Sequence, residues 1–321
     1  MKRHNQILIG VLVVQIILSV VVFWPRSAAT GGGEPLFPDL EASDVVMLAI
    51  EDDEGNRIAL QKVAGDWVLP DADDYPAQAD QIDPILEKLV GLDTGRLVTR
   101  TDASHKRLGV AGDDFVRRLA LETADGKKYT LYLGTSPQYS AVHFRLGGQD
   151  ETYLGSGISS WEVDATADAW VDTTYMNVPQ EDVTRMTLEN DDGTFVFTRD
   201  AEGNWTMEGL ADGEIANATN INSVFHQATS LKLVNPLGKE EKSVYGMNAP
   251  NAIVTLETEG KTITLRVGAE DTTEEDRYFV KSSESPYYVR VARFSVKAMV
   301  ENTRDDFIQP PPTPTPEAST P

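Results

Sequence analysis

An apolar run close to the N-terminus is the first pattern along the chain. Ile7 to Trp24 is 18 residues long, is interrupted only by Gln15 and Ser19, and would form a helix of roughly 27 Å. Because a core helix would carry a polar stripe, we expect a membrane-spanning helix here. The run is long for a cleaved signal, yet residues 27–29 resemble a cleavage site, so a retained anchor is expected and cleavage stays open.

Past residue 40 the apolar positions change to the alternation that is typical of antiparallel strands. Val45 to Glu51, Arg57 to Val63 and Trp67 to Leu69 are predicted to form a three-stranded meander, with turns at Gly55 and Gly65. A helix is predicted next, since apolar side chains then recur at a spacing of three and four residues behind a capping residue. They are Ile82, Ile85, Leu86, Leu89 and Val90, behind Asp80.

Two hairpins and a short helix complete this pattern. Phe115 to Thr123 turns into Lys127 to Leu133, in which Tyr129, Leu131 and Leu133 alternate with polar residues and predict one buried face. The second hairpin and the helix follow at His143 to Leu146, Thr152 to Leu154 and Ile158 to Val163.

The same pattern occurs twice. The stretch that begins at Asp44 matches the one that begins at Asp182 without a gap, at an offset of 138 residues, and this aligns Trp67 with Trp205 as two large core residues. A repeat of this length indicates duplicated domains. The predicted fold class is therefore α+β, with an N-terminal transmembrane helix followed by two tandem copies of an antiparallel-sheet-plus-helix unit.

The second copy has its own markers. Its helix is predicted to be capped by Thr219, and Tyr245-Gly246-Met247 parallels Leu108-Gly109-Val110 of the first copy. A hairpin is expected from Ile253 to Thr258 and Lys261 to Val267.

These patterns divide the chain into five parts. Residues 1–26 are the cytoplasmic stub and transmembrane anchor, and residues 27–40, rich in Gly and Pro, form a flexible linker. Residues 41–175 and 176–308 are the first and second α+β repeats. Residues 309–321 alternate Pro and Thr without an apolar face, which predicts a disordered, extended tail.

The charge pattern predicts where the body lies. Lys2 and Arg3 precede the apolar run, and such residues stay in the cytoplasm, so the body is expected to be extracytoplasmic on a single-pass membrane protein. Apart from Lys2, Arg3 and Arg26, the chain carries 25 basic against 51 acidic residues, a net charge of −26. Nucleic acid is therefore excluded as a partner, and the body is expected to stand off an anionic membrane surface.

The composition also removes whole classes of chemistry. The chain has no cysteine, which excludes disulfides, thiol nucleophiles and thiolate metal sites. No two histidines stand at metal-ligand spacing, and no G-x-S-x-G or phosphate-binding glycine motif occurs. We therefore predict no catalytic, cofactor-binding or metal-ligating residue and no cofactor. The histidines are His4, His105, His143 and His226.

Two acidic clusters leave an alternative open. Their carboxylates have the hard oxygen atoms that Ca²⁺ prefers, and a carboxylate pair can also cleave a glycosidic bond, but neither cluster has EF-hand spacing. Solvated loops are the simpler expectation, so neutralising Asp73, Asp271 or His143 should change stability by less than about 0.5 kcal/mol if these residues are exposed. The clusters are Asp71, Asp73 and Asp74, and Glu270, Asp271, Glu274, Glu275 and Asp276.

Several short motifs in both copies resemble one bacterial family. They are Trp170-Val171-Asp172, Asp182-Val183-Thr184-Arg185, Tyr245-Gly246-Met247-Asn248-Ala249-Pro250 and Thr262-Ile263-Thr264-Leu265-Arg266-Val267-Gly268. The chain is similar in these motifs to the domain of unknown function 4340 family. That resemblance implies one N-terminal membrane span, genes beside ABC-type transport systems of the gliding-motility kind, and an extracytoplasmic accessory role without established active-site residues.

The expected function is that of a non-enzymatic extracytoplasmic accessory or binding protein of the cell envelope, linked by the resemblance to an ABC-type transport system. Its expected partners are the lipid bilayer, through the N-terminal helix, and an envelope or transporter protein. The alternative is an envelope hydrolase or a calcium-dependent binding protein that uses the acidic loops.

Overall fold

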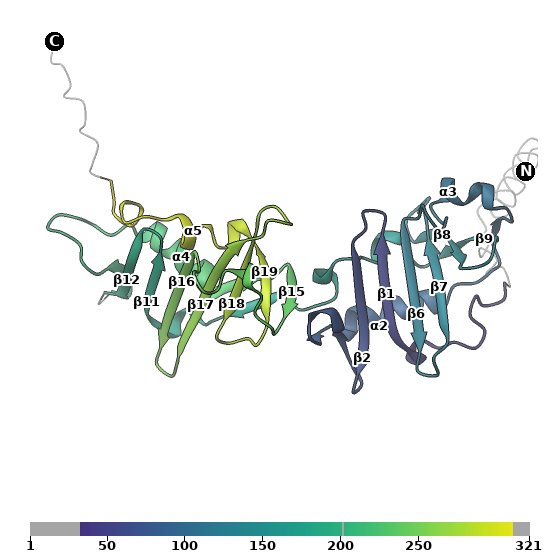
Figure 1. Ribbon diagram of the computed structural model, residues 1–321, viewed down its shortest axis with the longest axis horizontal. Helices are drawn as coiled ribbons and strands as arrows, with labels where there is room; N and C mark the ends of the chain where they lie inside the picture. The colour runs from purple at the N-terminus through teal and green to yellow at the C-terminus, as the bar shows by residue number, and fades with distance from the viewer. Residues whose placement is uncertain (1–32, 201, 311–321) are drawn as a thin grey trace, which may run out of the picture. The chain divides into compact units, whose positions relative to one another are not determined.

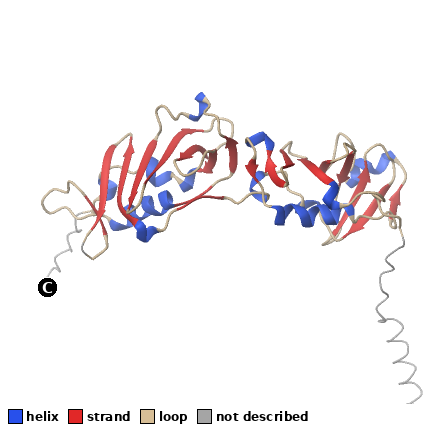
Figure 2. Cartoon of the chain, turned by 90° about the horizontal axis from the view of Figure 1, so that it is seen from below, coloured by secondary structure: helices blue, strands red, loops and turns tan. Residues whose placement is uncertain are grey.

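The computed structural model describes residues 33–200 and 202–310 (Figure 1). This part of the chain has an α+β fold with two large antiparallel sheets and few helices, which confirms the predicted class (Figure 2). No helix among these residues is both long and apolar enough to cross a membrane. The predicted span Ile7 to Trp24, linker residues 27–32 and tail residues 311–321 lie outside the described residues.

The first sheet has nine strands in the order β4-β3-β2-β1-β6-β7-β8-β9-β5. The predicted meander and hairpins are present, with ends that differ by a few residues, whereas the two shortest strands, β4 and β5, have no counterpart in the prediction. The strands are β1 Val45–Asp52, β2 Arg57–Val63, β3 Asp66–Leu69, β4 Tyr75–Pro76, β5 Leu97–Thr99, β6 Arg117–Thr123, β7 Lys128–Leu133, β8 Ala141–Leu146 and β9 Thr152–Ser156.

Helix α2 (Ala79–Val90) forms where the apolar spacing predicts it. Ile82, Leu86 and Leu89 are fully buried, which places the apolar stripe of the helix in the core. A single turn of helix, α3 (His105–Leu108), ends at Gly109, whose φ of 67° is the left-handed conformation that glycine favours at such an end. The predicted closing helix is reduced to the 3₁₀ turn η4 (Ser160–Glu162).

The second sheet has eight strands in the order β13-β12-β11-β16-β17-β18-β19-β15. They are β11 Val183–Asn190, β12 Gly193–Arg199, β13 Trp205–Met207, β15 Asn235–Gly238, β16 Ala252–Thr258, β17 Thr262–Glu270, β18 Arg277–Ser282 and β19 Tyr288–Ala292. Two further strands, β10 (Thr174–Asn177) and β14 (Ser230–Lys232), pair with each other.

Helix α4 (Ala218–Thr229) begins before the predicted position. Asn217, not Thr219, is its N-cap, and the Asn217 side chain accepts a hydrogen bond from the Asn220 backbone N–H. An Asn at this position satisfies a donor that the first turn leaves free, and Thr219 lies inside the helix. The short helix α5 is Lys297–Glu301.

The two sheets follow one plan. Counted from β3 in the first sheet and from β13 in the second, the strands follow each other in corresponding order. Each sheet ends in a short strand, β5 or β15, that comes in the chain between the third and fourth strands of this order. Trp67 and Trp205 lie in corresponding strands, β3 and β13, and both are buried, as predicted. Gly134 follows β7, and Gly268 lies in the corresponding strand β17. A Cβ on Gly134 would meet the Leu108 carbonyl oxygen at 1.9 Å, and a Cβ on Gly268 would meet the Tyr245 carbonyl oxygen at 2.0 Å.

Candidate functional site

A pocket of about 430 Å³ opens in the second sheet between the 3₁₀ turn η7 (Ser243–Tyr245), the end of β17 and strands β18 and β19. Its volume lies within the range of small-molecule sites. Val244 at its mouth is 65% exposed, whereas Tyr245 and Phe279 at its base are buried. We call this the aromatic pocket.

The backbone around Gly246 positions the pocket. Gly246 ends η7 with a φ of 68°, so the chain reverses directly after Tyr245. The Tyr245 carbonyl then lies against Gly268 of β17, where only a hydrogen atom fits. This close approach holds the η7 turn over the sheet and turns the Tyr245 ring toward β18.

Three aromatic rings pack together at the base of the pocket. The ring centroid of Tyr245 lies 4.8 Å from that of Phe279 and 5.4 Å from that of Tyr288, both in tilted arrangements. Tyr288 donates a hydrogen bond to Glu241, and burial, together with this bond, raises the Tyr288 pKa. Its phenol therefore stays neutral near pH 7, and the cluster presents an apolar wall to a ligand.

Two cationic side chains flank the rings. The Lys242 Nζ lies 6.0 Å from the Tyr245 ring centroid, and the Arg290 guanidinium lies 5.7 Å from that of Phe279. Cations at such distances are attracted to the faces of aromatic rings. The pocket therefore combines an apolar base with positive charge at its side.

Asp271 holds Arg290 in place. The carboxylate of Asp271 is buried, accepts hydrogen bonds from the Thr273 N–H and hydroxyl, and lies 2.5 Å from Arg290 Nε. Burial alone would raise its pKa, but the bonds from Thr273 and Arg290 outweigh this effect and lower the Asp271 pKa to about 2. Glu274 binds the same guanidinium at 3.0 Å, so two carboxylates face the single positive charge of Arg290.

This arrangement is suited to binding and poorly suited to acid–base catalysis. A general acid or base works best with a pKa near the operating pH, and Asp271 stays ionised well below it. Glu270 at the rim pairs with Arg293. The chemistry that the pocket offers is an apolar base with an ion pair fixed beside it.

The corresponding place in the first sheet has different side chains. His143 lies opposite Leu154 in the β8–β9 pair, just as Phe279 lies opposite Arg290 in the β18–β19 pair. His143 shares a hydrogen bond with the Thr135 hydroxyl at 2.9 Å, and burial lowers the His143 pKa. Leu108 stands where the second sheet has Tyr245. The ring cluster and its ion pair are therefore features of the second sheet.

The histidines considered from the sequence are spread over the fold. His105 is buried with Nε2 2.9 Å from the Asp150 carbonyl, His143 contacts Thr135, and exposed His226 lies 2.8 Å from the Gln180 amide. Within residues 33–200 and 202–310, no three His, Cys, Asp or Glu side chains lie where they could share a metal ion. His4 lies outside the described residues.

The acidic clusters differ from each other. Asp71, Asp73 and Asp74 are all exposed, as a solvated loop predicts. In the second cluster Glu274, Glu275 and Asp276 are exposed too. Asp271 is not, so the expectation of a solvated Asp271 is wrong, because Arg290 and Thr273 provide inside the fold the partners that water would provide outside it.

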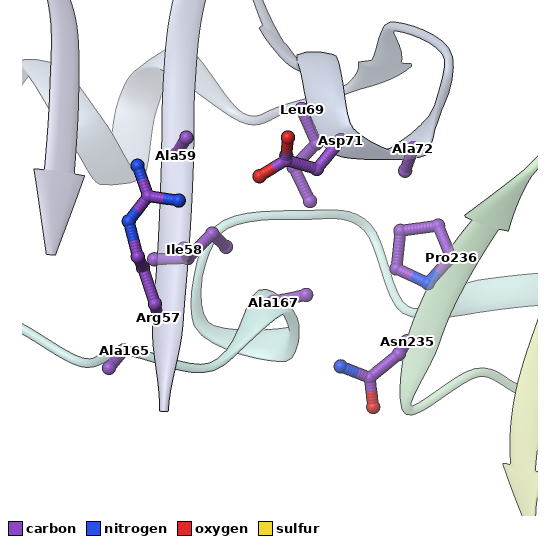
Figure 3. Close-up of a pocket in the computed structure, with 10 residues that line it drawn as sticks. All are labelled: Arg57, Ile58, Ala59, Leu69, Asp71, Ala72, Ala165, Ala167, Asn235 and Pro236. Atoms are coloured by element: carbon purple, nitrogen blue, oxygen red, sulfur yellow. The ribbon is translucent and has the colours of Figure 1, made fainter. Parts of the chain in front are cut away.

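Figure 3 shows a second hollow, of about 130 Å³. All ten lining residues belong to the compact unit that holds residues 55–82 and the residues from 164 onward, and most are apolar. Its ionisable lining residues are Arg57 and Asp71. The volume is well below that of ordinary ligand sites, so we give it no functional role.

The comparison with protein families decides the identity of the chain. A family described as Domain of unknown function (DUF4340) matches residues 67–250, more than half of the chain. The chain belongs to the DUF4340 family. The DUF4340 match begins within β3 of the first sheet and ends at Pro250, two residues before β16 of the second, so it includes η7 and Tyr245. No curated protein and no solved structure matches this DUF4340 chain.

Sequence reasoning missed the aromatic pocket. Tyr245 lies 34 residues before Phe279, and Arg290 lies in the next strand, so no local pattern joins the three residues. One signal was available: the internal match aligns Leu108 of the first half with Tyr245 of the second. A difference of this kind, within an otherwise shared pattern, marks where one half of this DUF4340 protein has its own chemistry.

Proposed function

We propose that this protein is a non-enzymatic, extracytoplasmic binding protein of the cell envelope, anchored by Ile7 to Trp24, whose aromatic pocket takes an apolar side chain of an envelope or transporter protein. The observation that carries the proposal is the pocket itself. It has an apolar base, an exposed Val244 at its mouth, and an ion pair between buried Asp271 and Arg290 at its side.

We also infer that residues 41–175 and 176–308 are two copies of one unit. The corresponding strand orders and the shared close approach at Gly134 and Gly268 support this inference. If both copies keep the same scaffold, a difference at the pocket is the place where binding has specialised.

The proposed site is a protein-binding site and not an acidic catalytic loop, for a physical reason. Carboxylates that cut a glycosidic bond or hold Ca²⁺ need free oxygen atoms or a raised pKa on one partner. Asp271 instead has a lowered pKa, and its oxygen atoms accept bonds from Thr273 and Arg290. An apolar anchor in a pocket of this size is typical of a protein interface.

Photo-crosslinking in intact cells tests the proposal. A photoreactive residue in place of Thr272, an exposed residue that lines the pocket, should attach one envelope or transporter protein, to be named by mass spectrometry after solubilisation of the membranes in detergent. Val244→Glu should abolish capture of that protein and leave the melting temperature unchanged, because Val244 is exposed. Ile215→Glu, at a side chain 60% exposed and away from the pocket, is the matched control and should retain capture. Equal capture by both variants would refute the assignment.

A further inference from the structure

The described chain begins beside the outermost strand of the first sheet. Pro35 pairs with Asp93, the Leu36 N–H donates to the Leu92 carbonyl, and the Thr94 N–H donates to the Glu34 carbonyl. Residues 34–36 are therefore fixed against residues 92–94, which lead directly into β5 (Leu97–Thr99). Strand β5 is the end strand of the sheet, next to β9.

The proposed anchor gives this end of the unit a short tether. From Trp24 to Gly33 the chain has nine peptide steps, which extend to at most about 30 Å. If Ile7 to Trp24 spans the bilayer, residues 33–36 must stay within that distance of the membrane surface. This distance limit rests on the proposed function, whereas the exposure of the side chains on β5 does not.

The strand beside the tether has an exposed surface that is both apolar and basic. Leu97 and Val98 are 40% and 42% exposed, and Arg96 and Arg100 on either side are exposed as well. Residues 96–107 contain four basic residues and one acidic residue, in a chain whose net charge is −23. Screening limits electrostatic reach to about 8 Å at physiological salt, so this local excess counts more than the net charge of the body.

Two large aromatic side chains are exposed near the C-terminal end of strand β9. Tyr139 is 81% and Trp161 57% exposed, and their ring centroids are 6.0 Å apart. Strand β9 runs from β5 toward them: Tyr153 pairs with Leu97, and four residues further along the chain the Gly157 N–H donates to the Ser140 carbonyl, next to Tyr139. Trp and Tyr are the residues that favour the boundary between lipid and water.

We propose that Arg96, Leu97, Val98, Arg100, Tyr139 and Trp161 form a membrane-contacting surface, which rests on the outer face of the bilayer that anchors the chain. Apolar and aromatic side chains would lie among the headgroups, and the arginines would lie against lipid phosphates. We call it the tether-side surface. It modifies the expectation that the body stands off the membrane, because residues 96–107 carry a local excess of positive charge.

The absence of cysteine allows a direct test on the full-length protein. One cysteine is introduced at Val98, at Tyr139 or, as a control, at Ile215 between β13 and α4, and is labelled with an environment-sensitive fluorophore. The protein is reconstituted in vesicles of phosphatidylcholine with a minor share of phosphatidylglycerol. Lipids with a nitroxide on the headgroup should quench the labels at positions 98 and 139 several-fold more than the label at 215.

A variant links the effect to this surface. Leu97→Asp combined with Val98→Asp should reduce quenching of the label at 139 to the level of the control, without a change in melting temperature, because both side chains are exposed. If a chain retained in the vesicles shows equal quenching at 98, 139 and 215, the tether-side surface does not contact the membrane, and the proposed anchor stands. If the chain is instead washed from the vesicles by carbonate, the proposed anchor fails first.

Discussion

Asp271 keeps a charged carboxylate inside the fold. Replacing it by Asn would leave the Arg290 guanidinium without its buried partner, which typically costs about 3 to 5 kcal/mol. We therefore expect Asp271→Asn to lower the free energy of unfolding by about this amount in urea titrations. Glu275→Gln, an exposed change in the same loop, should alter it by less than about 0.5 kcal/mol.

The same carboxylate gives a pH signature with a definite sign. Its folded-state pKa, about 2, lies below the ordinary value of 3.8, so its stabilisation is complete above about pH 4 to 5 and is lost as the pH falls toward 2. The stability difference between the wild type and Asp271→Asn should therefore shrink by about 2 kcal/mol between pH 6 and pH 2. A difference that stays constant over this range would show that the ion pair does not form.

Buried tryptophans make a second test at the scale of the residue. Trp67 and Trp205 lie in corresponding strands of the two sheets. Truncating either one to Ala should lower the free energy of unfolding by about 3 to 5 kcal/mol, because it leaves a cavity in the core. Thermal melts of the two single variants measure this. Trp161→Ala, at an exposed side chain, is the control and should melt as the wild type does.

At the scale of the element, one backbone contact fixes the η7 turn to β17. A methyl group at position 268 would lie 2.0 Å from the Tyr245 carbonyl oxygen, so Gly268→Ala must displace the turn. We expect a loss of about 3 kcal/mol in stability, at the upper end for overpacking, together with loss of partner capture. Gly260→Ala has no atom within 4 Å of the new methyl group and should be neutral. Equal melting of the two variants would contradict this account.

The long strands could be predicted from the sequence and the short ones could not. Strands β1 to β3 follow from alternation and from turns at Gly55 and Gly65, whose φ values of 86° and 101° suit glycine. Strand β5 has exposed Leu97 and Val98, so it shows no buried face and no periodic signal. Its place is set by pairing with β9, more than 50 residues away, which local patterns do not reveal.

The candidate site was beyond local patterns for a similar reason. Phe279 and Arg290 become neighbours only through the register of β18 with β19, and Tyr245 reaches them from a separate turn. The burial of Asp271 was also hidden, because an acidic residue in a polar loop is normally solvated. What the sequence did reveal was the internal match, from which the difference between Leu108 and Tyr245 can be seen.

At the scale of the whole molecule, the orientation of the chain can be tested by proteolysis. If Lys2 and Arg3 stay in the cytoplasm, protease added outside spheroplasts should digest or release the body and leave a small membrane-held stub. A cytoplasmic protein probed in the same sample serves as the control for intact membranes. Full protection of the chain would contradict the extracytoplasmic assignment, whereas a mature N-terminus near Thr30 would indicate cleavage.

The order of the strands along the chain has a consequence for how the protein is made. Every strand of the first sheet ends by residue 156, and every strand of the second sheet begins at residue 183 or later. All backbone pairs of the first sheet can therefore close while the second is still being synthesised. Domains that fold in this sequence avoid exposing two sets of open strand edges at once, which is the circumstance in which tandem repeats of similar sequence exchange strands and misfold.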